Sequence, residues 1–128
     1  MDNKTIISTS NAPAPIGPYS QAILSGNTLY ISGQIGLNPA SGALVADDIA
    51  TETRQVMENL RAILVKAGMD FAQVVKASIF IKDMNQFSAI NEVYATYFTD
   101  APPPARETVE VSKLPKSVNV EISMIAVR

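Results

Sequence analysis

The sequence contains no cysteine and no histidine. Without cysteine the chain has no disulfide, no thiol nucleophile and no thiolate metal site. Without histidine it also lacks the commonest general base and the commonest metal ligand. Any chemistry that the protein performs must therefore rest on other side chains.

Charged residues are few, and neither sign dominates. They make up 17% of the chain, whereas hydrophobic residues make up 47%, and the net charge is -2. A small protein with so little charge can bury apolar surface between subunits, so we expect an oligomer. An acidic chain offers no basic surface to attract nucleic acid, and we expect no nucleic-acid partner.

Long apolar runs are also missing. No segment approaches the length of a membrane span, and residues 1–15 lack the basic start and apolar core of a signal peptide. We expect no membrane contact and a cytoplasmic location. The chain has 128 residues without repeats, low-complexity tracts or linkers, which predicts a single domain over residues 1–128.

The first third of the sequence predicts strands joined by a rigid loop. Residues 4–9 (KTIIST) can form a short strand, and residues 12–21 are broken by three prolines and a glycine. Residues 20–35 then alternate on both sides of Gly26-Asn27, which is typical of a β-hairpin with a tight turn.

The hydrophobic period changes to that of a helix after Asp47 and Asp48. Apolar residues recur at three- and four-residue spacing from Ile49 to Ala67, with an aspartate as the N-terminal cap and Gly68 after the end. A second helix is predicted to run from a cap at Asp83 to Phe98. We interpret three aromatic residues of this segment as helix packing: Tyr94, Tyr97 and Phe98.

Three further strands complete the pattern, at residues 74–82, 107–114 and 118–127. In the first of them the buried face is predicted to carry Val75, Ala77, Ile79 and Ile81. The order of elements predicts an α+β protein with a mixed sheet and two helices on one face. The opposite sheet face also carries apolar residues, namely Phe80, Ile125 and Val127. Two helices cannot cover both faces, so we expect subunits to cover the second one.

The segment PPPARETVEV, residues 102–111, places one arginine after three prolines. Prolines fix φ and impose an extended, semi-rigid chain, so Arg106 is delivered with little freedom. Taken alone, the segment is also typical of a stiff surface loop that ends in a solvated arginine.

Several short motifs together resemble the reactive intermediate deaminase family (Rid, YjgF type), which includes 2-iminobutanoate/2-iminopropanoate deaminases. They are GPYSQA (17–22), SGQI (32–35), NEVYATYF (91–98), PPARETVEVSKLP (103–115) and VEISMIAV (120–127). The resemblance spans nearly the whole chain in the family's order. It implies a chorismate-mutase-like fold and a homotrimer with active sites in clefts between subunits.

The resemblance also implies roles for individual residues. Arg106 matches the arginine that binds the substrate carboxylate, and Glu121 matches the acid that holds and activates water. Thr108 stands where many relatives have cysteine, and its main-chain carbonyl is expected to accept the imine N–H. The other positions expected to bind substrate are Tyr19, Ser32, Gly33 and Asn91.

The expected reaction suits these residue types. The planar fork of arginine matches a carboxylate, and a glutamate can accept a proton from water, an effect worth about 10²–10⁴-fold. Imines already hydrolyse in water, so we expect no metal and no cofactor. Two alternatives remain open: an endoribonuclease or translation inhibitor, and a trimer that binds small carboxylates without catalysis. Glu121 favours catalysis, although alone it is also typical of a solvated strand residue.

Overall fold

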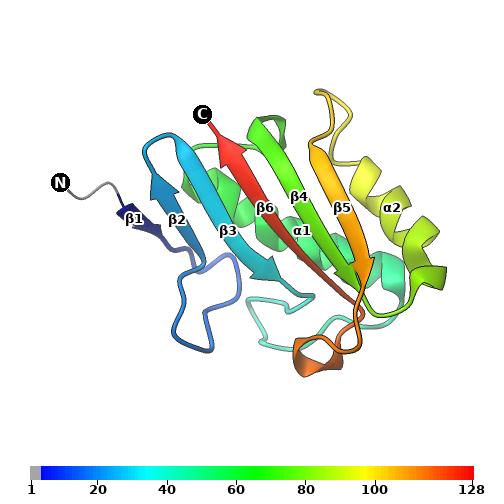
Figure 1. Ribbon diagram of the computed structural model, residues 1–128. Helices are drawn as coiled ribbons and strands as arrows, with labels where there is room; N and C mark the ends of the chain where they lie inside the picture. The colour runs from blue at the N-terminus through cyan, green and yellow to red at the C-terminus, as the bar shows by residue number, and fades with distance from the viewer. Residues whose placement is uncertain (1–3) are drawn as a thin grey trace.

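The computed structural model describes residues 4–128, which form one six-stranded sheet in the order β1-β2-β3-β6-β4-β5 (Figure 1). Neighbouring strands are antiparallel except β4 and β5, which are parallel, so the sheet is mixed. The strands are β1 (Lys4–Ile7), β2 (Ala22–Ser25), β3 (Thr28–Gln34), β4 (Val74–Ile81), β5 (Ala105–Glu110) and β6 (Val120–Val127).

Two helices, α1 (Ile49–Lys66) and α2 (Phe87–Ala95), cover one face of this sheet (Figure 1). Short 3-10 turns precede β4, α2 and β6, at Phe71–Gln73, Met84–Gln86 and Pro115–Ser117. The predicted α+β class and the single helical layer are therefore confirmed. Among residues 4–128, neither helix has the length and apolar character needed to cross a membrane.

The last strand, β6, lies in the middle of the sheet between β3 and β4. Its even-numbered residues from Val120 to Ala126 are almost completely buried in the core beneath α1. Successive side chains of a strand point to opposite faces, so its odd-numbered residues, including Glu121, face away from the helices. The strict alternation predicted for this strand is confirmed.

The predicted hairpin is also confirmed. Strands β2 and β3 pair in antiparallel register with Ser25 opposite Thr28, and Gly26 between them has a φ of 60°. That left-handed conformation is open to glycine without the steric cost that a side chain would bring.

Two boundary predictions are wrong. Val75 was expected in the core, but the ladder between β4 and β6 shifts register between Val74 and Lys76. Val74 is therefore buried, and the side chain of Val75 is 47% exposed. Asp83 caps the 3-10 turn through a 3.0 Å bond from the Asn85 N–H. The second helix was expected to start directly after Asp83, but it starts three residues later, at Phe87, and ends at Ala95 instead of Phe98.

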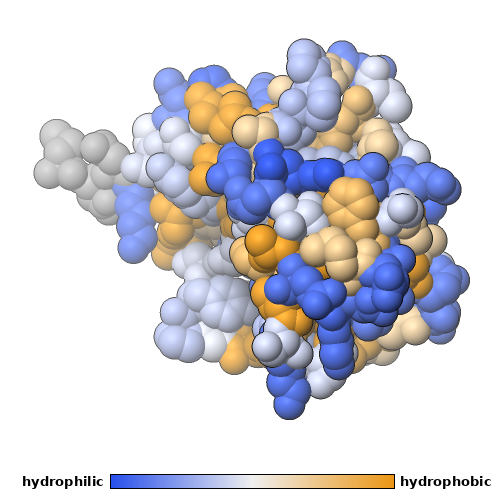
Figure 2. All heavy atoms as spheres, turned by 45° about the vertical axis from the view of Figure 1, so that its right-hand side comes forward, coloured by the Kyte–Doolittle hydropathy of each residue, from blue (hydrophilic) through white to orange (hydrophobic). Residues whose placement is uncertain are grey.

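The sheet face away from the helices leaves apolar side chains accessible, as the sequence predicts. Tyr30, Val109 and Val127 are each more than a third exposed there. Figure 2 shows apolar groups at the surface among hydrophilic ones on the side of the molecule that carries β5 and α2.

Candidate functional site

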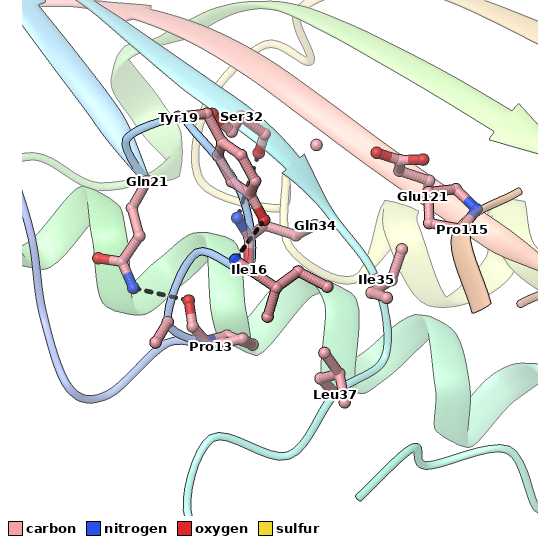
Figure 3. Close-up of a pocket in the computed structure, with 12 residues that line it drawn as sticks. Pro13, Ile16, Tyr19, Gln21, Ser32, Gln34, Ile35, Leu37, Pro115 and Glu121 are labelled. Atoms are coloured by element: carbon pink, nitrogen blue, oxygen red, sulfur yellow. Dashed lines mark hydrogen bonds between the residues drawn. The ribbon is translucent and has the colours of Figure 1, made fainter. Parts of the chain in front are cut away.

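A cavity of about 400 Å³ lies beside the end of β3 and the start of β6. It brings together four of the predicted site residues, which are Tyr19, Ser32, Gly33 and Glu121. Figure 3 shows Tyr19 on one side of the end of β3 and Glu121 with Pro115 on the other. Much of the remaining lining is apolar and includes Ile16, Ile35 and Leu37.

Gly33 allows the Glu121 carboxyl group to lie against β3. The ladder between β3 and β6 is irregular between Ile31 and Gln34, where Gly33 is located. A Cβ atom at Gly33 would lie 2.9 Å from the carboxyl carbon of Glu121 and would overlap its nearer oxygen. Only glycine therefore leaves room for the carboxyl group in this position.

The carboxyl group of Glu121 is partly desolvated. Burial disfavours its charged form and raises its pKa above the ordinary value of 4.5. A carboxylate with a raised pKa is a stronger proton acceptor, which is the property that a general base needs. The cavity therefore contains one group suited to taking a proton from water.

Backbone contacts hold the opposite wall of the cavity. The Ser32 hydroxyl donates to the carbonyl of Ser20 at 2.6 Å, and the half-exposed Tyr19 accepts a 3.5 Å bond from the Ile16 N–H at its hydroxyl. Gln21, which we did not single out from the sequence, is buried and donates to the carbonyls of Ala12 and Pro13 at 3.2 and 2.8 Å. These hydrogen bonds of the Gln21 amide hold the proline-rich loop beside the start of β2.

A second hollow, of about 360 Å³, lies between α2 and β5. It contains Arg106 and Asn91 together with Tyr94, Pro103 and Pro104. Arg106 is the second residue of β5 and lies opposite Ala77 of β4 in the parallel ladder. The strand was predicted to start at Glu107, but it starts two residues earlier, at Ala105, so the arginine is part of the strand and does not precede it.

The guanidinium of Arg106 is fixed mainly by α2. Its Nη1 donates to Oδ1 of Asn91 at 2.7 Å. Its central carbon lies 5.6 Å from the ring centre of Phe87 and 5.0 Å from that of Tyr94. Cation–π contacts of this kind are worth about 0.5–2 kcal/mol each. We expected the prolines to hold the arginine, but the hydrogen bond and both ring contacts come from the helix.

Two buried hydroxyl groups near Arg106 have no hydrogen-bond partner in the described chain, those of Tyr94 and Thr108. Burial raises the pKa of Tyr94 to about 12, so its hydroxyl stays protonated at neutral pH. Thr108 follows Arg106 by two residues on β5 and therefore faces the same side of the sheet. We had interpreted Tyr94 as helix packing, but it also lines the arginine hollow.

Arg106 and Glu121 do not meet within one chain. Arg106 contacts side chains of α2 on the helical face, whereas Glu121 faces the other side of the sheet and lines the other cavity. The chain thus places a guanidinium and a partly buried carboxyl group in two separate hollows. Across residues 4–128, no group of three Asp or Glu side chains is arranged to hold a metal ion.

Comparison with known proteins gives one family. Residues 9–128 match the family model described as Endoribonuclease L-PSP. A RutC family protein of Pyrococcus horikoshii is 54% identical, over 96% of this chain and 97% of its own. The 2-iminobutanoate/2-iminopropanoate deaminase of Homo sapiens is 46% identical, over 98% of this chain and 90% of its own.

Solved structures agree with this fold. A Yersinia pestis protein of the conserved Rid family superposes with a TM-score of 0.95 at 51% identity, covering 98% of this chain and 99% of its own. Escherichia coli TdcF, solved with bound serine, superposes with a TM-score of 0.94 at 42% identity and the same coverage. The chain therefore belongs to the Endoribonuclease L-PSP family, the family of the YjgF and Rid proteins.

Proposed function

We propose that the protein hydrolyses 2-imino acids, such as 2-iminopropanoate and 2-iminobutanoate, to 2-keto acids and ammonia. The observation that carries the proposal is the guanidinium of Arg106, which is held by Asn91 and two aromatic rings beside an open hollow. Such a group can bind a planar carboxylate through two parallel bonds. The deaminase names of mammalian relatives about 50% identical to this chain support the same substrate class.

In this proposal the working unit is a homotrimer, and each site combines Arg106 of one subunit with the Glu121 cavity of its neighbour. Two features support this arrangement. The two residues face opposite sides of one sheet, and the sheet face that carries Glu121 also exposes apolar side chains that a neighbour would cover. A cyclic trimer repeats the same contact three times and closes it.

The proposed reaction uses both residues in sequence. Arg106 binds the substrate carboxylate and so fixes the adjacent C=N carbon, while the Thr108 carbonyl accepts the imine N–H. Glu121 removes a proton from water as the oxygen attacks that carbon, and it passes this proton to the imine nitrogen, which gives a neutral carbinolamine. Glu121 then takes the proton of the carbinolamine hydroxyl and delivers it to the nitrogen, so the C=O bond forms as the C–N bond breaks and ammonia leaves. Positioning and proton transfer supply the rate increase, and no cofactor enters the reaction.

A coupled assay tests this function. A dehydratase acting on serine releases 2-aminoacrylate, which tautomerises to 2-iminopropanoate, and the rate of pyruvate formation is followed with and without the protein. We expect an acceleration that saturates with substrate, that is lost in Arg106→Ala and that is strongly reduced in Glu121→Gln. Equal rates with and without the wild-type protein would contradict the proposal.

Two other functions remain candidates. The description of the family model favours RNA cleavage. The chain has ten lysine and arginine residues against twelve acidic ones and no histidine, so it offers few phosphate contacts. Binding without catalysis is favoured by the serine found in TdcF. RNA binding that falls steeply with salt would support the first function, and saturable keto-acid binding without turnover would support the second.

A further inference from the structure

Helix α1 contains a glutamate inside the protein core. Glu52 is 1% exposed, and both of its carboxyl oxygens accept hydrogen bonds from one residue, Asn119. The backbone N–H of Asn119 donates to Oε2 at 2.9 Å, and its side-chain amide donates to Oε1 at 2.8 Å. Burying a carboxyl group is costly unless it is fully hydrogen-bonded, and this pair satisfies both oxygens.

The loop after β3 leaves space for this pair. A Cβ atom at Gly36 would lie 3.0 Å from Cγ of Glu52 and 3.3 Å from its carbonyl oxygen. Contacts that close are rare, so a side chain at Gly36 would displace either the loop or the glutamate. The glycine, the helix and Asn119 thus form one closely packed unit.

A strained turn, Pro115–Ser117, ends two residues before Asn119. Lys116 and Ser117, adjacent non-glycine residues, have φ angles of 55° and 57°, in the left-handed region that side chains disfavour. A strained segment persists only where its surroundings hold it. Asn119 is held from two sides, because its carbonyl also accepts a 3.0 Å bond from the Lys82 N–H.

The turn leads directly into the cavity. Pro115, at its start, lines the same cavity as Glu121, which follows Asn119 by two residues. Only Val120, the first residue of β6, separates Asn119 from Glu121, so we expect a shift of Asn119 along the strand direction to move Glu121. We propose that Glu52 is a positioning residue, which sets the place of the Glu121 carboxyl group through its paired bonds to Asn119. The proposal rests on the proposed function in assigning Glu121 the task of activating water.

An exchange of the carboxyl group of Glu52 and the side-chain amide of Asn119 tests whether this pair positions Glu121. Asn119→Asp replaces the donating side-chain amide by a carboxyl group, so two carboxyl groups face each other, and rotation of either group does not relieve their repulsion. Adding Glu52→Gln to it restores a complementary pair: the new amide oxygen accepts the backbone N–H, and the new amide NH₂ donates to the new carboxyl. We expect Asn119→Asp to lower kcat by about 10–100-fold with KM changed less than about twofold, and the double variant to recover most of kcat.

Thr53→Val is the matched control. Thr53 is the neighbouring residue on α1, is fully buried, and uses its hydroxyl only within the helix, in a 2.7 Å bond to the carbonyl of Ile49. We expect it to lower the melting temperature without changing kcat. Asn119→Ala provides a second variant if Asn119→Asp does not fold. It keeps the backbone bond but removes the side-chain bond and leaves Oε1 of Glu52 without that donor, so we expect kcat to fall here as well.

A carboxyl carbon NMR titration of Glu121 supplies a readout that does not depend on turnover. We expect the titration of Glu121 to move in Asn119→Asp and to return in the double variant, which carries the same new carboxyl group. If the wild-type protein fails to hydrolyse imines, the proposed function fails, but this titration still decides the positioning role. The inference is overturned if Asn119→Asp lowers stability alone, or if the double variant restores stability without restoring kcat or the Glu121 titration.

Discussion

Arg106 and Glu121 lie on opposite faces of one sheet, with β4 between their strands. Arg106 is aligned with Ala77 of β4 and Glu121 with Phe80 of the same strand. The arginine side chain contacts Tyr94 of α2, whereas the glutamate lines the cavity near the end of β3. A substrate of six or seven heavy atoms, such as 2-iminopropanoate or 2-iminobutanoate, cannot bridge the two groups through the sheet of a single subunit.

Subunit mixing tests the shared site. Arg106→Ala should be inactive alone, and Glu121→Gln should retain only a small fraction of the wild-type activity. When equal amounts are unfolded and refolded together, random assembly leaves about a quarter of the sites with both residues intact, and activity should recover to about that fraction of the wild type. Each variant refolded alone is the control. Continued inactivity of a mixture that forms hybrid trimers would contradict a site shared between subunits.

Native mass spectrometry checks the assembly directly. We expect a species of about three times the chain mass of 13.7 kDa, because one sheet face exposes apolar side chains such as Tyr30 and Val127. The same measurement counts hybrids in the mixing experiment when one variant is isotopically labelled. A stable monomer would contradict the proposed trimer.

Asn91 should control how well Arg106 binds a carboxylate. Asn91→Ala removes the acceptor of the 2.7 Å hydrogen bond from Arg106. The guanidinium is then free to rotate between the rings of Phe87 and Tyr94. We expect KM to rise about tenfold, since a hydrogen bond to a charged group contributes about 1.5–3 kcal/mol. Steady-state kinetics of imine hydrolysis measure this KM. The control is Glu92→Gln, because Glu92 is the exposed neighbour of Asn91 on the same helix. An unchanged KM would show that the rings alone hold the guanidinium.

Gly33→Ala should inactivate the protein while leaving it folded. The new methyl group would overlap the Glu121 carboxyl group and push it out of position. We expect kcat to fall about 100-fold, in line with the cost of a 1 Å misplacement of a reacting group. Gly17→Ala is the control, because its Cβ would make only ordinary contacts, at 3.6 Å from the Tyr19 ring. Full activity of Gly33→Ala would mean that Glu121 acts from another position.

The raised pKa of Glu121 predicts how stability depends on pH. Burial favours its protonated form, so its favourable contribution is complete below the ordinary pKa of 4.5 and is lost as pH rises through the higher folded-state value. Glu121→Gln stays neutral at every pH. The variant should therefore gain stability relative to the wild type as the pH rises above the ordinary pKa of 4.5.

Urea unfolding at matched protein concentrations measures this difference, because oligomer stability depends on concentration. The same titration should appear in catalysis. As the pH is lowered, kcat should decrease when Glu121 becomes protonated, and this decrease should begin at a higher pH than for an ordinary glutamate with a pKa of 4.5. A relative stability that does not change with pH would contradict the burial of this carboxyl group.

Local patterns predicted most of the fold because each depended on near neighbours. The helix from Ile49 and the alternation of β6 follow from hydrophobic period, and the turn at Gly26 follows from a glycine that allows positive φ. The exposed Val75 was missed because its orientation depends on a register shift against another strand. A bulge of this kind leaves no mark in the period of a single strand.

The family resemblance supplied the candidate residues but not their supports. Gln21 and Glu52 are buried polar residues whose partners lie at least eight and 67 residues away, respectively, so no local pattern indicates them. The hydrogen bond between Asn91 and Arg106 likewise joins a helix to a strand. It depends on how α2 packs against β5, which no local pattern in the sequence predicts.

The central place of β6 has a consequence for synthesis of the protein. The strands before it form two separate groups, β1 to β3 and β4 with β5, which are joined in the sheet only through β6. On the ribosome, neither group can be completed until Val120–Val127 has left the exit tunnel. The nascent chain must keep both groups from pairing with other chains until then, and a message truncated before these codons would yield two unpaired strand edges prone to aggregation.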